Sequence, residues 1–344
     1  MKIEEKVLLA PYTTFGIGGH ARYFASVTSE QELVEALEFA QEKNLRIFIL
    51  GSGSNILVSD QGFDGLVIHN QIKDFKSVER DDEVFITSGA GENWDTIVER
   101  SVAKGLSGIE LLSGIPGTIG AAPVQNIGAY GTSVDRVLQS VRVYNRTTKT
   151  FEVLTQEQCH FSYRSSIFKE QGISRYIITS VTLRFSQAQG ALPSYPDLAS
   201  KFEKGGHPSV ASLREAVIEI RASKGMVVMP EYESYKSAGS FFQNPIVSKE
   251  QFEDLLPLPC KTPWYWVLTD GRVKISAACL IQQAGFVKGY REGNVGLSPR
   301  HTLAIVNYGN ATSSEIRNFA KSISERVKEK FSITLEQEVQ YIGL

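Results

Sequence analysis

The segment LLSGIPGTIGAAPVQNIGAYGTSV, residues 111–134, is the longest stretch of the chain without a charged side chain. It contains five glycines, the prolines Pro116 and Pro123, and the amides Gln125 and Asn126. This composition excludes a membrane-spanning helix, which needs a continuous apolar run. The segment instead predicts a glycine-rich loop whose backbone N–H groups can approach an anion closely.

A second glycine-rich turn, LGSGSN at residues 50–55, follows the strand-like pattern RIFIL. The next residues, ILVSD, are typical of another strand, whereas a dinucleotide-binding fingerprint needs a helix that begins at the loop. GIGGHA, residues 16–21, has the glycine spacing of that fingerprint but neither a preceding strand nor a following helix. The turns therefore favour phosphate-holding loops over a Rossmann fold, and tight turns in a strand-rich domain are the structural alternative.

The overall composition is that of a globular protein with two or three domains. The 344 residues carry a net charge of −2, with 42% hydrophobic and 22% charged residues, which offers no basic face for nucleic acid. The opening residues, MKIEEKVLLAPY, lack a signal-peptide pattern, so we expect a cytoplasmic location. Cys159, Cys260 and Cys279 are an odd number at long spacings, and we expect buried thiols rather than a disulfide framework or a metal site.

Periodic patterns indicate an α+β architecture, strand-rich up to about residue 210 and alternating afterwards. The expected helices cover residues 29–44, 93–105, 212–224, 248–256, 274–285 and 313–331. The expected strands include residues 46–50, 84–90, a hairpin over 137–154, 175–185, 264–268, 302–307 and 332–343. Capping-box signals stand at Ser29 with Glu32 and at Thr312 with Glu315. The polar residues 186–208 are expected to form a loop.

Six motifs follow one another along the chain: TTFGIGG, LGSGSNILVSD, GIPGTIGAAPVQNIGAYG, FSYRSSIFK, AGSFFQNP and LEQEV. Together they resemble the UDP-N-acetylenolpyruvoylglucosamine reductase family, in its long-loop (type I) subclass, over nearly the whole chain. The resemblance implies a FAD-binding fold of the vanillyl-alcohol-oxidase (PCMH) type with two α+β subdomains, 1–70 and 71–208, and an α+β substrate-binding domain, 209–331. The closing strands, 332–344, are candidates to join the second subdomain.

The resemblance also implies noncovalent FAD, with NADPH as co-substrate and one pocket shared by NADPH and the UDP-sugar. The residues expected to contact FAD lie in the two glycine-rich loops and at one later position: Gly51, Ser52, Gly53, Ser54, Asn55, Gly114, Pro116, Gly117, Thr118, Gly120, Gln125, Asn126, Ala129 and Arg221. The loops carry no charged side chain, which suits neutralisation of the diphosphate by backbone amides.

The family reduces the enolpyruvyl ether of UDP-N-acetylglucosamine enolpyruvate to a lactyl ether. By resemblance, Ser240 supplies a proton, Arg164 pairs with the substrate carboxylate in the enolate-like state, and Glu338 supports the same intermediate. Four further residues match the family's substrate contacts: Tyr195, Lys224, Asn244 and His301. The chain departs from the family pattern at Gly225, Met226 and Gln340, near the expected UDP contacts.

The residues alone leave alternatives open. Arg164 and Glu338 could each form a surface ion pair, and His301 could be a core histidine. Ser240 lacks the Gly-x-Ser-x-Gly elbow of a serine hydrolase, because Phe242 replaces the second glycine. The rival functions are another noncovalent-FAD oxidoreductase acting on a sugar or alcohol, a serine hydrolase, and a nonenzymatic FAD or nucleotide-sugar sensor. We expect a monomer without nucleic-acid or membrane partners.

Overall fold

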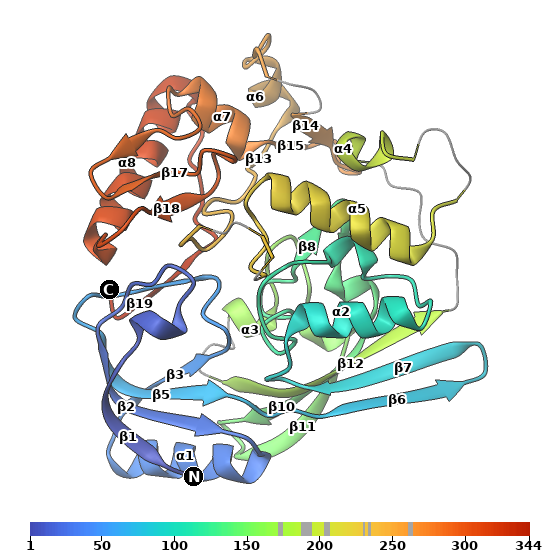
Figure 1. Ribbon diagram of the computed structural model, residues 1–344, viewed down its shortest axis with the longest axis vertical. Helices are drawn as coiled ribbons and strands as arrows, with labels where there is room; N and C mark the ends of the chain where they lie inside the picture. The colour runs from blue at the N-terminus through green and yellow to red at the C-terminus, as the bar shows by residue number, and fades with distance from the viewer. Residues whose placement is uncertain (171–174, 187–194, 203–206, 230, 233–234, 261–263) are drawn as a thin grey trace. The chain divides into compact units, whose positions relative to one another are not determined.

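The computed structural model describes residues 1–170, 175–186, 195–202, 207–229, 231–232, 235–260 and 264–344 (Figure 1). The chain forms two compact units. Unit 1 comprises Met1–Val7, Ala21–Gly53 and Asp64–Tyr232, and unit 2 comprises Leu8–His20, Ser54–Phe63 and Glu233–Leu344. The chain passes from one unit to the other between Gly53 and Ser54, inside the second glycine-rich turn. The three-part division with boundaries at residues 70 and 208 stays a prediction.

Within the described residues, unit 1 is built on a four-stranded sheet of order β1-β2-β5-β3 and a five-stranded sheet of order β11-β10-β12-β7-β6. Their strands are β1 (Ile3–Leu8), β2 (His20–Val27), β3 (Arg46–Leu50), β5 (Phe63–Asn70), β6 (Phe75–Arg80), β7 (Glu83–Gly89), β10 (Leu138–Asn145), β11 (Thr150–Thr155) and β12 (Tyr176–Ser186). The five-stranded sheet is antiparallel, and the hairpin expected over residues 137–154 is its β10–β11 pair.

The two glycine turns that have fingerprint-like spacing both lead into strands. Residues 16–21 run into β2, and residues 50–55 run into β4 (Ile56–Val58). Because neither turn opens a helix, the structure confirms that these are not Rossmann fingerprints.

Helices α1 (Glu30–Glu42) and α2 (Trp94–Ala103) each cover a face of one sheet in unit 1 (Figure 1). Ser29 caps α1 by accepting the N–H of Glu32, and Asn93 caps α2 by accepting the N–H of Thr96. The predicted capping box at Ser29 is incomplete, since the Glu32 carboxylate accepts from Thr28 instead.

The remaining elements of unit 1 are short, apart from one helix. They are η2 (Glu110–Leu112), β8 (Gly128–Ala129), β9 (Thr132–Ser133), η3 (Val134–Arg136), η4 (Glu157–Cys159), α3 (Ile167–Glu170), α4 (Pro196–Ala199) and the long α5 (Val210–Ser223). The stretch predicted as a loop contains α4, and its residues 187–194 and 203–206 lie outside the described residues. Leu213 and Val217 of α5 pack against Leu111, which sets α5 beside the start of the glycine-rich segment.

Unit 2 has one main hydrophobic core, formed by three small sheets and three helices in the part of the chain that the structure describes. Its elements are η1 (Ala10–Tyr12), β4, β13 (Ile246–Val247), α6 (Lys249–Glu253), β14 (Tyr265–Val267), β15 (Val273–Ile275), α7 (Ala277–Gln283), β16 (Arg291–Glu292), β17 (Val295–Leu297), β18 (Ile305–Asn307), α8 (Ser313–Phe331) and β19 (Gln340–Ile342). The predicted capping box of α8 is confirmed. None of the described helices is long and apolar enough to span a bilayer.

Two expectations for unit 2 are corrected. The helix predicted to start at residue 274 begins at Ala277, because Val273–Ile275 forms the central strand of a sheet. Cys260 and Cys279, expected as separate thiols, form a disulfide with their Cα atoms 5.9 Å apart, within the usual range. Their sequence spacing did not reveal that the chain after α6 returns to the first turn of α7. Cys159 is a buried free thiol, and burial raises its pKa to about 12.

Glu30, at the start of α1, connects this helix to strands β10 and β12, and its contribution to the stability of unit 1 can be tested. Its carboxylate accepts from Nε and Nη2 of Arg142 at 2.7 and 2.9 Å and from the Thr179 hydroxyl at 2.7 Å. The hydrogen bonds from Arg142 hold the pKa of Glu30 below its usual range. Because the pair is partly exposed, we expect Glu30→Gln to lower the free energy of unfolding by only about 1 kcal/mol.

The effect of Glu30→Gln should depend on pH. A carboxyl whose pKa is lowered by folding stabilises the protein above its unfolded pKa of about 4.3, and this contribution is lost as the pH falls through the folded value. Urea unfolding of both proteins at about pH 7 and about pH 3 would show the difference at neutral pH and its loss in acid. A difference of the same size at both pH values would contradict the assignment.

Candidate active site

The two glycine-rich loops predicted to hold FAD lie against each other in unit 1. A Cβ atom at Gly51, directly after β3, would stand only 2.9 Å from Oγ1 of Thr118 in the other loop. Thr118 itself is buried. Glycine at position 51 therefore permits a close approach that any larger residue would prevent. The sequence predicted both loops, and the structure brings them together.

Backbone hydrogen bonds hold the longer loop against the start of α2. Gly120 donates to the carbonyl of Ala90 at 3.0 Å, and Ile119 donates to that of Glu92 at 2.9 Å. A Cβ atom at Gly120 would lie 2.5 Å from the Cβ of Ala90. Two non-bonded carbon atoms cannot be this close, so the loop or the chain at Ala90 would have to shift. This part of the loop is thus fixed by main-chain bonds, and its own side chains need carry no charge.

Arg164, the predicted carboxylate partner, is tied to the same segment. The backbone of Arg164 is left-handed, with a φ of 56°. The Nη2 atom of Arg164 donates to the carbonyl of Gly128 at 3.0 Å. Nearby, the buried amide of Asn126 donates to the carbonyl of Ser162 at 3.2 Å. Arg164 therefore stands beside the loop predicted to line the flavin, and its role toward the substrate carboxylate stays a prediction.

Tyr195 and Lys224 also lie in unit 1. The ring of Tyr195 packs edge-on against Tyr130, with centroids 5.7 Å apart, and burial raises the pKa of both phenols. Lys224 donates to the carboxylate of Asp197 at 2.8 Å. Sequence reasoning missed Tyr130, although it follows Ala129 within the QNIGAYG motif that indicated the loop.

Arg221 provides the test of whether these residues fit FAD. Its Nη2 donates to the carbonyl of Met226 at 3.0 Å, whereas its buried Nε has no hydrogen-bond acceptor among the described residues. Burial lowers the pKa of this guanidinium. A buried N–H group without an acceptor is costly, and a ligand with phosphate or ring acceptors beside the glycine-rich loop would satisfy it. The residues therefore fit the cofactor.

The other residues predicted to contact FAD follow the same two loops: Ser52, Gly53, Ser54, Asn55, Gly114, Pro116, Gly117, Gln125 and Ala129. Ser54 and Asn55 belong to unit 2, and the other seven belong to unit 1. The individual contacts with FAD stay predictions.

Ser240, the predicted proton donor, lies half-buried in unit 2. It stands between Gly239, which has a left-handed φ of 70°, and the buried Phe241 and Phe242. A Cβ atom at Gly239 would meet no atom within 4 Å. The phenylalanine rings thus fix the turn from the core side, and the chain before Ser240 borders open space.

The segment after Ser240 pairs with the segment that carries Glu338. The N–H of Glu338 donates to the carbonyl of Phe241 at 2.9 Å, and Phe242 bridges Gln337. Glu338 is only 8% exposed, so its alternative as a surface ion pair is wrong. The pairing brings the backbones of Ser240 and Glu338 close together.

Asn244 and His301 lie in the same part of unit 2. Oδ1 of Asn244 accepts the N–H of Ala277 at 2.9 Å, where α7 begins. Nδ1 of His301 accepts the N–H of Leu303 at 3.2 Å, and the carbonyl of Leu303 accepts the N–H of Phe241 at 2.8 Å. The structure therefore links the chain at His301 to the turn at Ser240.

Comparison with known proteins shows the family. Residues 230–342 match the family described as UDP-N-acetylenolpyruvoylglucosamine reductase, C-terminal domain, and residues 21–153 match the FAD binding domain. A UDP-N-acetylenolpyruvoylglucosamine reductase from Thermobifida fusca is 42% identical, covering 98% of this chain and 97% of its own length. The chain belongs to the UDP-N-acetylenolpyruvoylglucosamine reductase family.

A further relative and a solved structure support the same family assignment. A reductase from Cupriavidus pinatubonensis is 40% identical over 96% of both chains. The crystal structure of the reductase from Thermus caldophilus is similar with a TM-score of 0.65, 28% identity and 99% coverage of both chains. The predicted α+β class with a FAD-binding fold of the PCMH type is confirmed. The family also favours the predicted reductase over another FAD oxidoreductase.

The contact between the loops can be tested at Gly51. Because a Cβ would press on Thr118, we expect Gly51→Ala to weaken FAD binding roughly tenfold. Gly51→Ala combined with Thr118→Ala should recover part of the affinity, since the nearest atom is removed. FAD titration of the apoprotein by flavin fluorescence measures the effect.

Gly105→Ala is the matched control, because Gly105 has a φ of 72° but no atom within 4 Å of an added Cβ. It should strain the end of α2 and leave FAD affinity unchanged. Wild-type affinity in Gly51→Ala would show that the loops do not depend on this contact.

Proposed function

We propose that the chain catalyses the FAD-dependent reduction of UDP-N-acetylglucosamine enolpyruvate to UDP-N-acetylmuramate with NADPH, in peptidoglycan precursor synthesis. The observation that carries the proposal is the pairing of the Ser240 turn with the segment of the buried Glu338, in a chain of this reductase family. We also propose that it works in the cytoplasm, where NADPH is available, and as a monomer.

Bound FAD would supply the hydride-transfer chemistry that links NADPH oxidation to reduction of the substrate's enolpyruvyl group. The chain provides the setting. Backbone N–H groups of residues 51–55 would hold the diphosphate, and Arg221 would offer its buried Nε–H to the cofactor. The packed loops around Thr118 and Gly120 would fix the cofactor's position.

Ser240 would donate the proton to the carbon next to the substrate carboxylate. A hydroxyl is a weak acid in water, and it needs a site that excludes water and stabilises the oxygen left behind. Phe241 and Phe242 supply the apolar wall beside it. After the transfer the Ser240 oxygen would take a proton from solvent when the product leaves. No bond forms between Ser240 and the substrate.

Arg164 and Glu338 would act on the charge that develops when hydride arrives. The planar guanidinium of Arg164 would bind the substrate carboxylate with two parallel hydrogen bonds. The hydrogen bond to the carbonyl of Gly128 holds the guanidinium beside the glycine-rich segment. Glu338, buried and paired with Phe241, would support the same enolate-like state.

The remaining proposed contacts are with the nucleotide sugar. Tyr195 would close over the substrate with its ring supported by Tyr130. Lys224, Asn244 and His301 would contact the UDP part or the sugar. Lys224 would exchange its pairing with Asp197 for the diphosphate.

The direct test of this function is NADPH oxidation by purified protein with and without UDP-N-acetylglucosamine enolpyruvate. We expect substrate-dependent oxidation and release of yellow flavin on acid precipitation, as for noncovalent FAD. Colour retained in the pellet, or NADPH oxidation indifferent to the substrate, would count against the proposal. Labelling of Ser240 by a fluorophosphonate would favour a hydrolase instead.

The Ser240→Ala variant tests proton donation to the substrate separately from flavin reduction by NADPH. We expect flavin reduction by NADPH to stay within a few-fold of wild type, because the hydroxyl takes no part in that step. Reoxidation of the flavin by substrate should slow by at least about 100-fold, the usual contribution of a general acid.

Stopped-flow absorbance of the flavin measures both half-reactions of Ser240→Ala. Ser237→Ala is the matched control, because the Ser237 hydroxyl contacts the same turn by accepting the N–H of Gly239 at 3.4 Å but has no proposed part in proton transfer. Equal loss in both half-reactions of Ser240→Ala would show that Ser240 is structural.

A further inference from the structure

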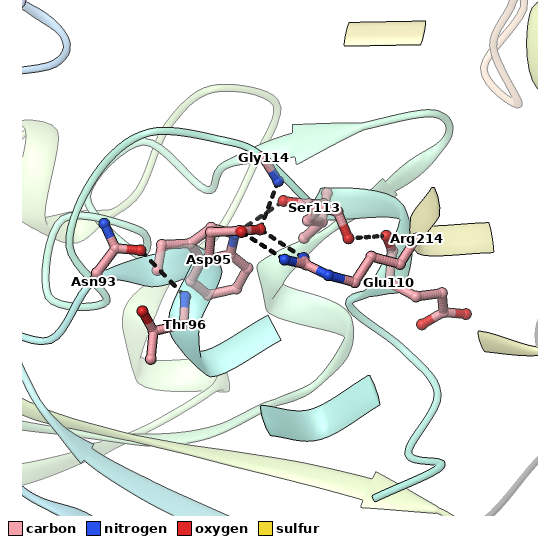
Figure 2. A network of polar contacts seen from close by, with 9 residues as sticks. Asn93, Asp95, Thr96, Glu110, Ser113, Gly114 and Arg214 are labelled. Atoms are coloured by element: carbon pink, nitrogen blue, oxygen red, sulfur yellow. Dashed lines mark hydrogen bonds and ion pairs between the residues drawn. The ribbon is translucent and has the colours of Figure 1, made fainter. Parts of the chain in front are cut away.

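A buried carboxylate stands behind the glycine-rich segment and is not among the residues predicted for the site. Asp95, in the first turn of α2, accepts from Nη1 and Nη2 of Arg214 at 2.7 Å each. The same carboxylate accepts the N–H of Gly114 at 2.6 Å. Figure 2 shows these three donors converging on Asp95. The carboxylate thus joins α2, α5 and the first glycine of the segment.

The Asp95–Arg214 ion pair lies largely out of solvent. The side chains of Asp95 and Arg214 are only 15% and 17% exposed. A pair removed from water gains little net stability, because both charges lose their hydration. Such a pair is better explained by the geometry that it imposes than by the stability that it adds.

The geometry concerns one face of α5. Arg214, Ile218 and Arg221 are four and three positions apart, so their side chains share a face of the helix. A Cβ atom at Gly114 would lie 2.8 Å from Cδ1 of Ile218 and 3.4 Å from Nε of Arg221. This face of α5 therefore packs directly on Gly114, whose left-handed φ of 69° needs glycine.

The two ends of this face have different partners. Arg214 is satisfied by the bidentate pair with Asp95, whereas the buried Nε of Arg221 has no acceptor in the part of the chain that the structure describes. A shift of α5 along its axis would move both arginines together, because a helix transmits displacement as a rigid body. The Asp95–Arg214 contact therefore sets where the Arg221 Nε–H points.

The chain on both sides of Gly114 is held as well. Nε1 of Trp94 donates to the carbonyl of Leu112 at 3.0 Å. The Ser113 hydroxyl donates to the carbonyl of Glu110 at 2.6 Å (Figure 2). The first bond fixes the segment to α2, the second lies within the segment, and neither involves α5. Among the bonds described around this loop, those of Asp95 reach both α5 and Gly114.

We propose that Asp95 and Arg214 are positioning residues of the FAD site, whose ion pair locks α5 against the glycine-rich segment and so aims the Arg221 Nε–H at the cofactor. The inference rests on the proposed FAD dependence. It also assigns the Gly114 N–H to Asp95, so Gly114 serves the cofactor through its shape and not as a donor.

The test compares matched changes in two bidentate arginine–carboxylate pairs of unit 1. Asp95→Asn removes the charge with little change in size and should raise the Kd for FAD about tenfold. Arg214→Lys keeps the charge but loses the fork and should raise the Kd less. The double variant Asp95→Asn/Arg214→Gln should bind no more weakly than Asp95→Asn, because the two residues act as one unit.

Glu30→Gln is the control, since Glu30 also accepts two bonds from one guanidinium, that of Arg142, away from the proposed site. It should lower the urea midpoint of the apoprotein and leave the Kd for FAD unchanged. Three readouts apply to every variant: FAD titration of the apoprotein, the visible spectrum of bound flavin, and urea unfolding without FAD. Asp95→Asn should shift the flavin spectrum, and Glu30→Gln should not.

The outcomes are distinguishable. A wild-type Kd for FAD and an unchanged flavin spectrum in Asp95→Asn and Arg214→Lys would overturn the positioning role and leave the proposed function standing. An equal rise of the Kd in Glu30→Gln would also overturn it, because weaker folding alone would then explain the loss. A wild-type protein that binds no FAD would overturn the proposed function itself.

Discussion

The contact between two backbones at Gly120 and Ala90 is the constraint on which the cofactor-binding unit depends. No side chain fits between them, since a Cβ at residue 120 would lie 2.5 Å from that of Ala90. The glycine-rich segment is therefore held at this point by main-chain bonds, and its own side chains need carry no charge. A second close approach, of the Gly51 backbone to the Thr118 side chain, joins the other glycine turn to this segment. The uncharged composition visible in the sequence is the consequence of this packing.

The sequence predicted the parts of the fold that depend on neighbours along the chain. Ser29 and Asn93 start helices by accepting an N–H three residues on, and the β10–β11 hairpin closes over a short turn, so local patterns suffice. Contacts between distant residues were not predictable in this way. Asp95 and Arg214 are 119 positions apart, and only the folded chain shows that they meet. The Cys260–Cys279 disulfide was missed because spacing alone does not report proximity.

The candidate site shows the same division. Motifs marked Ser240, Arg164 and Glu338, but the sequence did not reveal that the 241–243 segment pairs with the 336–338 segment or that Glu338 is buried. Nothing in the sequence singles out Asp95, because acids are common in the first turn of a helix, where they interact favourably with the helix dipole. Its three hydrogen bonds show a further task. The position of Asp95 at the start of α2 is visible in the sequence, whereas its distant partner Arg214 is visible only in the folded chain.

Asn55 shows how folding redistributes the work of a loop. The sequence groups it with the glycine turn that would cradle the diphosphate, yet its side-chain amide donates to the carbonyl of Glu338 at 3.1 Å, and its own carbonyl accepts the N–H of Gln340. These bonds hold the end of the turn against the segment that carries Glu338, a proposed catalytic acid, just before β19. Gly51, Ser52 and Gly53 instead belong to the unit that contains Thr118 and Arg221. The turn is therefore divided between the two units, and its second part, at Asn55, supports the chain at Glu338.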